Sequence, residues 1–188
     1  MLATLAGGVG AARFLAGLQR IVDPSDVVAI VNTADDDEFH GLHVSPDLDS
    51  VTYTLAGASN VAQGWGLEGE TFATLDALTR YDVPTWFRLG DKDLATHLFR
   101  TQRLRAGAPM STVTAEIAAA WGVNCRLLPM TDDRVRTRIT VQRTGGTEEL
   151  AMQAWFVGER AEPPVVAVRF EGAEAATPAP GVLDALET

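Results

Sequence analysis

A glycine-rich turn near the N-terminus has the residue types that bind phosphate. Gly7, Gly8 and Gly10 separate a short apolar run from a segment with apolar residues at helical spacing. Between a strand and a helix, glycines allow the backbone to approach a ligand closely, and the free N–H groups of the helix donate to an anion. Residues 8–13 match the dinucleotide pattern G-x-G-x-x-G except that Arg13 replaces the third glycine. We therefore expect the glycines and Arg13 to bind a phosphate or carboxylate; a turn that only packs the helix is the alternative.

Carboxylates gather in two places after the next apolar run. Asp35, Asp36 and Asp37 are consecutive, and Asp47 and Asp49 follow further along the chain. Divalent cations such as magnesium need only one or two carboxylates together with substrate phosphates. The second strand of a βαβ unit ends beside the first glycine turn, so Asp35 and Asp36 are expected at the crevice where ligands bind. A solvated acidic loop is the alternative for each cluster taken alone.

A charged turn precedes a predicted helix in the middle of the chain. Arg88 and Asp91 lie in the turn, and the helix that follows carries Asp93, His97 and Arg100. Side chains three or four residues apart share a helix face, so these last three are expected together. Two interpretations stay open for this face: a polar site, or a capping aspartate beside a structural histidine.

Hydrophobic periodicity predicts the elements that position these side chains. An apolar run, a helical pattern and a second apolar run follow one another at residues 1–6, 11–21 and 27–31, which is the order of a βαβ unit. The second run is apolar throughout, as a buried strand of a parallel sheet requires. Four further helices are predicted at 46–55, 71–80, 94–105 and 111–121, a strand at 126–128, a β-hairpin at 136–157 and a last strand at 165–170. Residues 171–188 are expected to form a linker or a short helix.

The charge balance and the single cysteine restrict the class of protein. The 15 Lys and Arg residues against 25 Asp and Glu residues give a net charge of −10, which does not supply the clustered cations of a nucleic-acid binder. Cys125 is the only cysteine, so we expect a buried thiol in a reducing compartment. Apolar stretches are much shorter than the ~20 residues of a membrane span, and the N-terminus does not look like a signal peptide. We expect a cytoplasmic protein with no membrane and no nucleic-acid partner.

Taken in order, these motifs resemble those of the 2-phospho-L-lactate transferase family, which takes part in the synthesis of the deazaflavin coenzyme F-420. The resemblance extends from residue 2 to about residue 170. Its matching segments are residues 5–13, 31–36, 40–42, 45–50, 65–67, 70–72, 89–97, 100–101, 127–133 and 153–156.

The resemblance implies a Rossmann-like α/β fold, with a parallel sheet, flanking helices and a β-hairpin insertion. It also implies a magnesium-dependent reaction in which a GDP-activated phospho-acid is transferred to 7,8-didemethyl-8-hydroxy-5-deazariboflavin (Fo) and GMP leaves. A hydroxyl would attack the distal phosphorus of a phosphoanhydride, so catalysis would consist mainly of positioning and charge neutralisation. Phospholactate and phosphoenolpyruvate differ by too few atoms to be distinguished by these motifs.

Roles for individual residues follow from their places in the family motifs. Asp49 matches an aspartate that contacts Fo in the family, so the resemblance implies a catalytic residue that orients the attacking hydroxyl of Fo. Asp49 is also a candidate metal ligand. Asp36 closes the Asn-Thr-x-x-Asp motif and is the second candidate for magnesium. The remaining candidate substrate contacts are Gly7, Gly8, Gly10, Arg13, Asn32, Arg88, Asp91 and Arg100. We expect Asp49 in an exposed loop, where asparagine would remove transfer and leave the fold intact.

The 188 residues have the length of one domain. Family members extend further, so the resemblance implies that this single α/β domain is the N-terminal part of a longer transferase, without the C-terminal part of the family fold. It also implies small-molecule substrates and a homodimer. Two alternatives remain: a nucleotide-sugar-binding regulatory relative without transferase activity, and a nicotinamide-binding Rossmann enzyme, which Arg13 in the place of a glycine disfavours.

Overall fold

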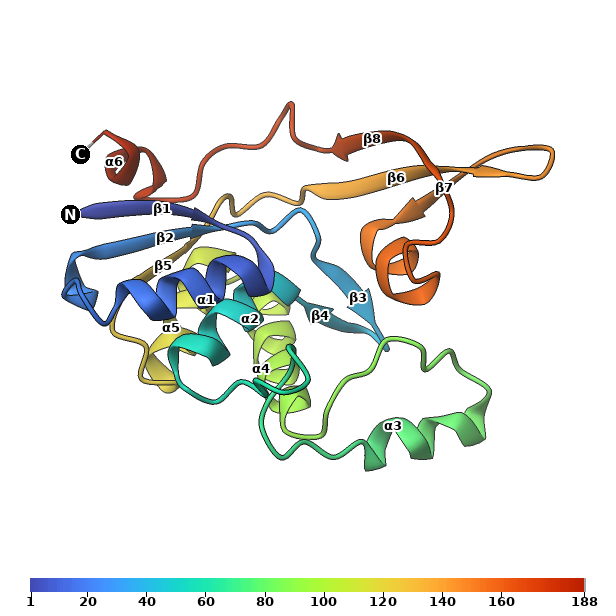
Figure 1. The fold of residues 1–188 in the computed structure, drawn as a ribbon, viewed down its shortest axis with the longest axis horizontal. Coiled ribbons are helices and arrows are strands. Elements are labelled where there is room, and N and C mark those ends of the chain that lie inside the picture. The colour runs from blue at the N-terminus through green and yellow to red at the C-terminus, as the bar shows by residue number, and fades with distance from the viewer. Residues whose placement is uncertain (188) are drawn as a thin grey trace.

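The centre of the fold is a three-stranded parallel sheet, seen in a computed structural model that describes residues 1–187 (Figure 1). Its strands are β1 (Leu2–Ala6), β2 (Val27–Val31) and β5 (Arg126–Pro129), in the order β1-β2-β5. All five residues of β2 are buried, because this central strand is covered on both faces. The predicted βαβ unit and parallel sheet are confirmed, and the carboxyl ends of the strands meet at one edge.

Helices cover both faces of this sheet. Val27, Ala29 and Val31 pack on one face against α1 (Gly8–Leu18), α2 (Pro46–Leu55) and α5 (Met110–Ala120). Val28 and Ile30 point to the other face, where they meet α6 (Val182–Leu186). Alternate residues of β2 therefore belong to two separate apolar clusters, as the two-residue period of a strand requires.

The helix boundaries differ from the prediction at four places, and one of them is α5, which begins and ends one residue before the predicted 111–121. Helix α1 begins at Gly8, which has a φ of +60°, and ends at Leu18, so both ends come earlier than the predicted 11–21. Helix α3 (Ala73–Leu78) is shorter than the predicted 71–80, and residues 79–81 form a short 3-10 turn. Helix α4 (Asp93–Arg105) begins one residue earlier than predicted. A 3-10 turn, Pro24–Asp26, precedes β2.

The predicted hairpin forms part of a second, antiparallel sheet. Strand β6 (Arg136–Arg143) lies between β7 (Gly146–Ala151) and β8 (Val165–Glu171). The second arm ends at Ala151, before the predicted residue 157, because Ala154–Gly158 forms a π-helical turn, η3. Within it, the indole N–H of Trp155 donates to the carbonyl of Pro163, which closes the connection to β8.

A short hairpin between β2 and α2 was not predicted. Strands β3 (Asp37–Phe39) and β4 (Leu42–Val44) pair antiparallel, and His40 and Gly41 connect them with φ values of 54° and 74°. Two consecutive residues with positive φ are typical of a type I′ turn. This hairpin carries the chain from the carboxyl edge of the sheet to the start of α2.

The C-terminal segment folds back on the main sheet. Thr177 bonds through its N–H and its hydroxyl to Asp133, and Thr131 pairs with Pro178. Helix α6 follows, so the residues predicted as a linker or short helix include a short helix; Thr188 lies outside the described residues. Within residues 1–187, every helix is too short or too polar to cross a membrane.

Candidate active site

The glycine turn faces a carboxylate of the protein itself. Gly7 precedes α1, and the N–H of Gly8 hydrogen-bonds to Asp47 at the start of α2. A Cβ atom would lie 3.4 Å from Asp47 Oδ2 if placed on Gly7, and 3.2 Å from Oδ1 if placed on Gly8. Glycine therefore allows the carboxylate of Asp47 to approach the backbone, whereas the binding of a ligand phosphate at the N-terminus of α1 stays a prediction. Gly10 has open space around its Cβ position.

Asn32 joins the glycine turn to the acidic loop after β2. Its Nδ2 donates to Asp47 Oδ2 at 2.9 Å and to Asp35 Oδ2 at 3.2 Å, and its Oδ1 accepts from the N–H of Ala34 at 3.1 Å. An amide is suited to this place because it supplies two N–H donors and one acceptor. Asn32 thus lies beside the glycine turn, whereas its contact with substrate stays a prediction.

The pKa of Asp47 is raised to about 6. Burial is the main cause, and the negative charges of Asp35 and Asp36 raise it further, whereas the hydrogen bonds from Asn32 and Gly8 lower it. Between pH 3.8 and about pH 6, Asp47 is therefore mostly protonated in the folded chain and mostly ionised in the unfolded chain. This carboxyl therefore favours folding at pH 5 more than at pH 8.

We expect carbon NMR of the Asp47 carboxyl group to report a midpoint near pH 6. In Asn32→Ala the midpoint should rise, because the variant removes a hydrogen bond to the ionised form. Asp91 is the internal control: the hydroxyl of Thr71 and N–H groups of residues 73 and 74 lower its pKa, and Asn32 does not contact it. A midpoint for Asp47 that falls in Asn32→Ala would contradict this account.

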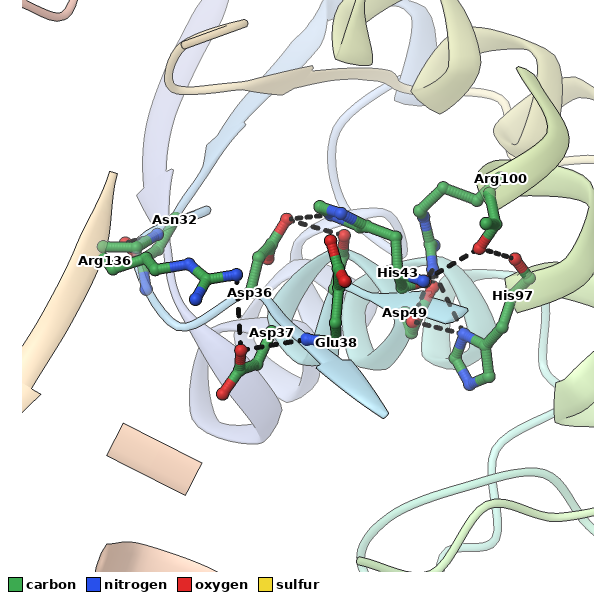
Figure 2. Close-up of polar contacts among 12 residues, drawn as sticks. Asn32, Asp36, Asp37, Glu38, His43, Asp49, His97, Arg100 and Arg136 are labelled. Carbon is green, nitrogen blue, oxygen red and sulfur yellow. Dashed lines mark hydrogen bonds and ion pairs between the residues drawn. The ribbon is translucent and has the colours of Figure 1, made fainter. Parts of the chain in front are cut away.

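Asp36 lies in the same acidic loop, with only 9% of its side chain exposed (Figure 2). Its Oδ2 accepts from the Ser45 hydroxyl at 2.7 Å and lies 3.0 Å from Nε2 of His43. Its Oδ1 has no hydrogen-bond partner in the described residues. Burial raises the pKa of Asp36, and the contacts with His43 and Ser45 oppose the rise. The free oxygen makes Asp36 suitable as a ligand of a cation.

Asp49 is buried against Arg100, so the expectation of an exposed loop carboxylate is wrong. Asp49 lies in the first turn of α2 with 5% of its surface exposed, and Arg100 of α4 is 2% exposed. The guanidinium donates to both carboxylate oxygens, with 3.2 Å between Nη1 and Oδ2. Burial alone would lower the pKa of Arg100, but Asp49 raises it. A buried carboxylate needs such a partner, and the partner comes from a distant helix.

Three further polar groups continue from Arg100: His97 and Tyr53 are buried and Asp93 is partly buried, and Figure 2 shows His97 beside Arg100. Arg100 Nη1 lies 3.2 Å from Nδ1 of His97, and because a guanidinium only donates, the proton of His97 is assigned to Nε2. Nε2 lies 3.0 Å from Oδ2 of Asp93, although the alignment falls short of a hydrogen bond. The Tyr53 hydroxyl donates to Asp93 Oδ1 at 2.5 Å. The expected shared face of Asp93, His97 and Arg100 is therefore confirmed.

Oxygen ligands suited to magnesium are present, but they differ in their partners. Ligand atoms of Asp49, Asp93 and His97 lie within 4.8 Å of one another. Arg100, however, already donates to Asp49 and contacts His97, so a metal ion there would meet a guanidinium. Asp36, with its unpartnered buried oxygen, fits the role of magnesium ligand better than Asp49 does.

Three predicted substrate contacts lie outside this group of buried polar residues. Asp91 accepts from the Thr71 hydroxyl and from two N–H groups at the start of α3, so its carboxylate holds that helix. Arg88 is exposed and stacks on Phe72, with 4.1 Å from Cζ to the ring centroid. Arg13 is exposed on α1. Whether these residues bind substrate stays a prediction.

Sequence reasoning missed three members of the site: His43, Ser45 and Tyr53. His43 and Ser45 surround the start of α2 and bind Asp36, and the His40-Gly41 turn that directs His43 inward was the available signal. Tyr53 is one helical turn after Asp49 in α2, and no pattern in the sequence indicates its contact with Asp93.

Comparisons with known proteins identify the family. The family model described as 2-phospho-L-lactate transferase CofD matches residues 2–188. Proteins named phosphoenolpyruvate transferase are 50% identical in Streptomyces avermitilis and 45% identical in Thermobifida fusca; the matches cover 98% and 99% of this chain. The chain spans 58% and 61% of the length of those relatives.

A solved structure shows the same fold at low sequence identity. A crystal structure of a UPF0052 family protein from Bacillus halodurans has a TM-score of 0.59 and 16% identity, and covers 98% of this chain and 55% of that one. This likeness supports a Rossmann-like fold. The family match over nearly the whole sequence leads to a single conclusion: the chain belongs to the CofD family of 2-phospho-L-lactate transferases.

Proposed function

We propose that this chain takes part in transferring a phospho-acid from a GDP-linked donor to Fo, with release of GMP, in the synthesis of coenzyme F-420. The observation that carries the proposal is that the glycine turn, Asn32, Asp36 and the Asp49–Arg100 pair meet around the start of α2, in a chain that the family model matches over residues 2–188. The name of the relatives, phosphoenolpyruvate transferase, makes a phosphoenolpyruvyl donor the first to test.

The arrangement supplies the parts that this reaction needs. The N–H groups of the glycine turn and the N-terminus of α1 would bind the phosphates of the donor. Asp49, held in one orientation by Arg100, would receive a hydrogen bond from the attacking hydroxyl and aim it at phosphorus. Magnesium, bound through Asp36, would neutralise the phosphate charge.

The test is a measurement of GMP release from a full-length protein that carries this segment. GMP should appear only when donor, Fo and magnesium are all present, and omission of any one of them should abolish release. No GMP with either a phosphoenolpyruvyl or a phospholactyl donor would contradict the proposal. Binding of a UDP-sugar without affinity for Fo would favour the regulatory alternative, and binding of NADH the nicotinamide one.

A further inference from the structure

The imidazole of His97 is buried behind the Asp49–Arg100 pair, and the proposed function gives it no role. His97 lies on α4, three residues before Arg100. Figure 2 shows the guanidinium of Arg100 in contact with Asp49 on one side and with the ring of His97 on the other. His97 therefore contacts the cation that holds the candidate catalytic carboxylate.

The guanidinium of Arg100 divides its N–H groups between Asp49 and His97. Nη2 donates to Oδ1 of Asp49, while Nη1 donates to Oδ2 of Asp49 and to Nδ1 of His97, both at 3.2 Å. The carbonyl of His43 lies further from Nη1, at 3.5 Å. Because Nη1 carries two hydrogens, it has one for each of its two closer acceptors. His97 thus fixes the guanidinium at a point outside the ion pair.

The contact with Arg100 requires one tautomer of His97. Nδ1 has to be the nitrogen without a proton, because a guanidinium only donates hydrogen bonds. The proton then lies on Nε2, which faces Oδ2 of Asp93 at 3.0 Å across one turn of α4. A carboxylate beside one ring nitrogen stabilises the tautomer that carries its proton there. Asp93 is held in turn by the hydroxyl of Tyr53, which donates to its Oδ1 at 2.5 Å.

Burial makes these contacts hard to replace. Tyr53, His97 and Arg100 are each at most 2% exposed, so water does not substitute for a lost partner. Removing the acceptor of His97 would leave a buried N–H of Arg100 unpaired, and an unpaired buried donor is costly. The guanidinium would then turn toward another acceptor, and the carboxylate bound to it would move as well.

We propose that His97 is a positioning residue for the transfer reaction. Its Nε2 proton is directed at Asp93, and its Nδ1 accepts from Arg100. Arg100 in turn holds Asp49 in the orientation that receives the attacking hydroxyl. The inference rests on the proposed function, because only that function supplies a hydroxyl to Asp49. The donor phosphates are assigned to the glycine turn, so the loss of His97 should act on turnover and leave donor affinity unchanged.

A matched pair of variants at position 97 tests this role. Asparagine places an amide oxygen near the position of Nδ1, whereas leucine has nearly the same shape and no acceptor. In a full-length protein that carries this segment, His97→Leu should lower kcat for GMP release by about 10–100-fold. The KM for the donor should stay at the wild-type value, and His97→Asn should recover most of the lost kcat. A purely structural role would reduce the folded fraction, measured by circular dichroism, without changing kcat per folded molecule.

Nitrogen NMR of the 188-residue chain gives a readout that does not depend on activity. The ring nitrogen shifts of His97 should show the Nε2–H tautomer, and Asp93→Ala should raise the fraction of the Nδ1–H tautomer. The Nη1 and Nη2 resonances of Arg100 should exchange slowly in the wild type and in His97→Asn, because hydrogen bonds restrict rotation of the guanidinium. In His97→Leu this exchange should be faster.

Thr114→Val is the control for a buried substitution outside the site. Thr114 is buried on α5 and its hydroxyl has no partner among the described residues, so kcat and the Arg100 resonances should not change. Wild-type kcat in His97→Leu, equal losses in His97→Leu and His97→Asn, or the Nδ1–H tautomer in the wild type would overturn the inference while leaving the proposed function standing. A wild-type protein that releases no GMP would overturn both.

Discussion

Replacing Arg100 with alanine is expected to lower the free energy of unfolding by about 3–5 kcal/mol, because Asp49 would stay buried without a partner. The two side chains come from α4 and α2, which are otherwise far apart in the sequence. Their ion pair also orders the contact with His97. Chemical denaturation monitored by circular dichroism would give the difference directly. Asp49→Asn should destabilise as well, since it leaves the guanidinium uncompensated.

The same helix provides the control. Arg103 makes a two-point contact with Glu116, but the pair is exposed, so Arg103→Ala should change stability little. In the double variant Asp49→Ala, Arg100→Ala the loss should be smaller than the sum of the two single losses, because neither charge is left alone. Equal losses from Arg100→Ala and Arg103→Ala would show that burial of the Asp49 pair does not matter.

Alanine at Gly90 is expected to destabilise the chain by about 1–2 kcal/mol through the loss of a helix cap. Its Cβ would lie 2.2 Å from Cδ of Glu70 and 2.5 Å from both carboxylate oxygens. The Glu70 carboxylate accepts hydrogen bonds from the N–H groups of Lys92, at 3.0 Å, and Asp93, at 2.8 Å, at the start of α4. Alanine at position 90 would displace this carboxylate and break both hydrogen bonds. Thermal or urea unfolding measures the effect.

Two comparisons test the cause of this loss. Glu70→Ala removes the same cap, so the double variant Gly90→Ala, Glu70→Ala should be no less stable than the worse single variant. Gly17→Ala is the matched glycine control: it lies in α1 with open space at its Cβ position, and it should stabilise by about 0.5–1 kcal/mol. Strict additivity of the Gly90 and Glu70 substitutions would exclude the proposed mechanism.

The parallel sheet could be predicted because its central strand is apolar at every position, from Val27 to Val31. The β3–β4 hairpin could not, since each strand has only three residues and neither shows a run or a clear alternation. The predicted start of α1 is three residues late because the glycines indicate a loop before the helix, whereas Gly8 is already part of the helix.

The part of the candidate site that could not be predicted depends on contacts between residues far apart in the sequence. The spacing of Asp93, His97 and Arg100 predicted a shared face, and the structure confirms it. Nothing local to Asp49 indicates that Arg100 covers it, so its burial was not foreseen. Asp91 was predicted to bind substrate, but its carboxylate caps α3. The sequence does not distinguish these two roles for a carboxylate in a charged turn.

Under the proposed function, Asp47 would make the glycine turn selective for the net charge of the ligand that binds there. The positive end of α1 already carries a carboxylate of the chain, with Asp35 and Asp36 nearby, so a bare phosphate would meet repulsion as well as N–H donors. A diphosphate that arrives together with magnesium carries less negative charge and meets less of this repulsion. Under the proposed function, the acidic surroundings would therefore discriminate against metal-free nucleotide and free inorganic phosphate, so that the turn is reserved for the complexed donor.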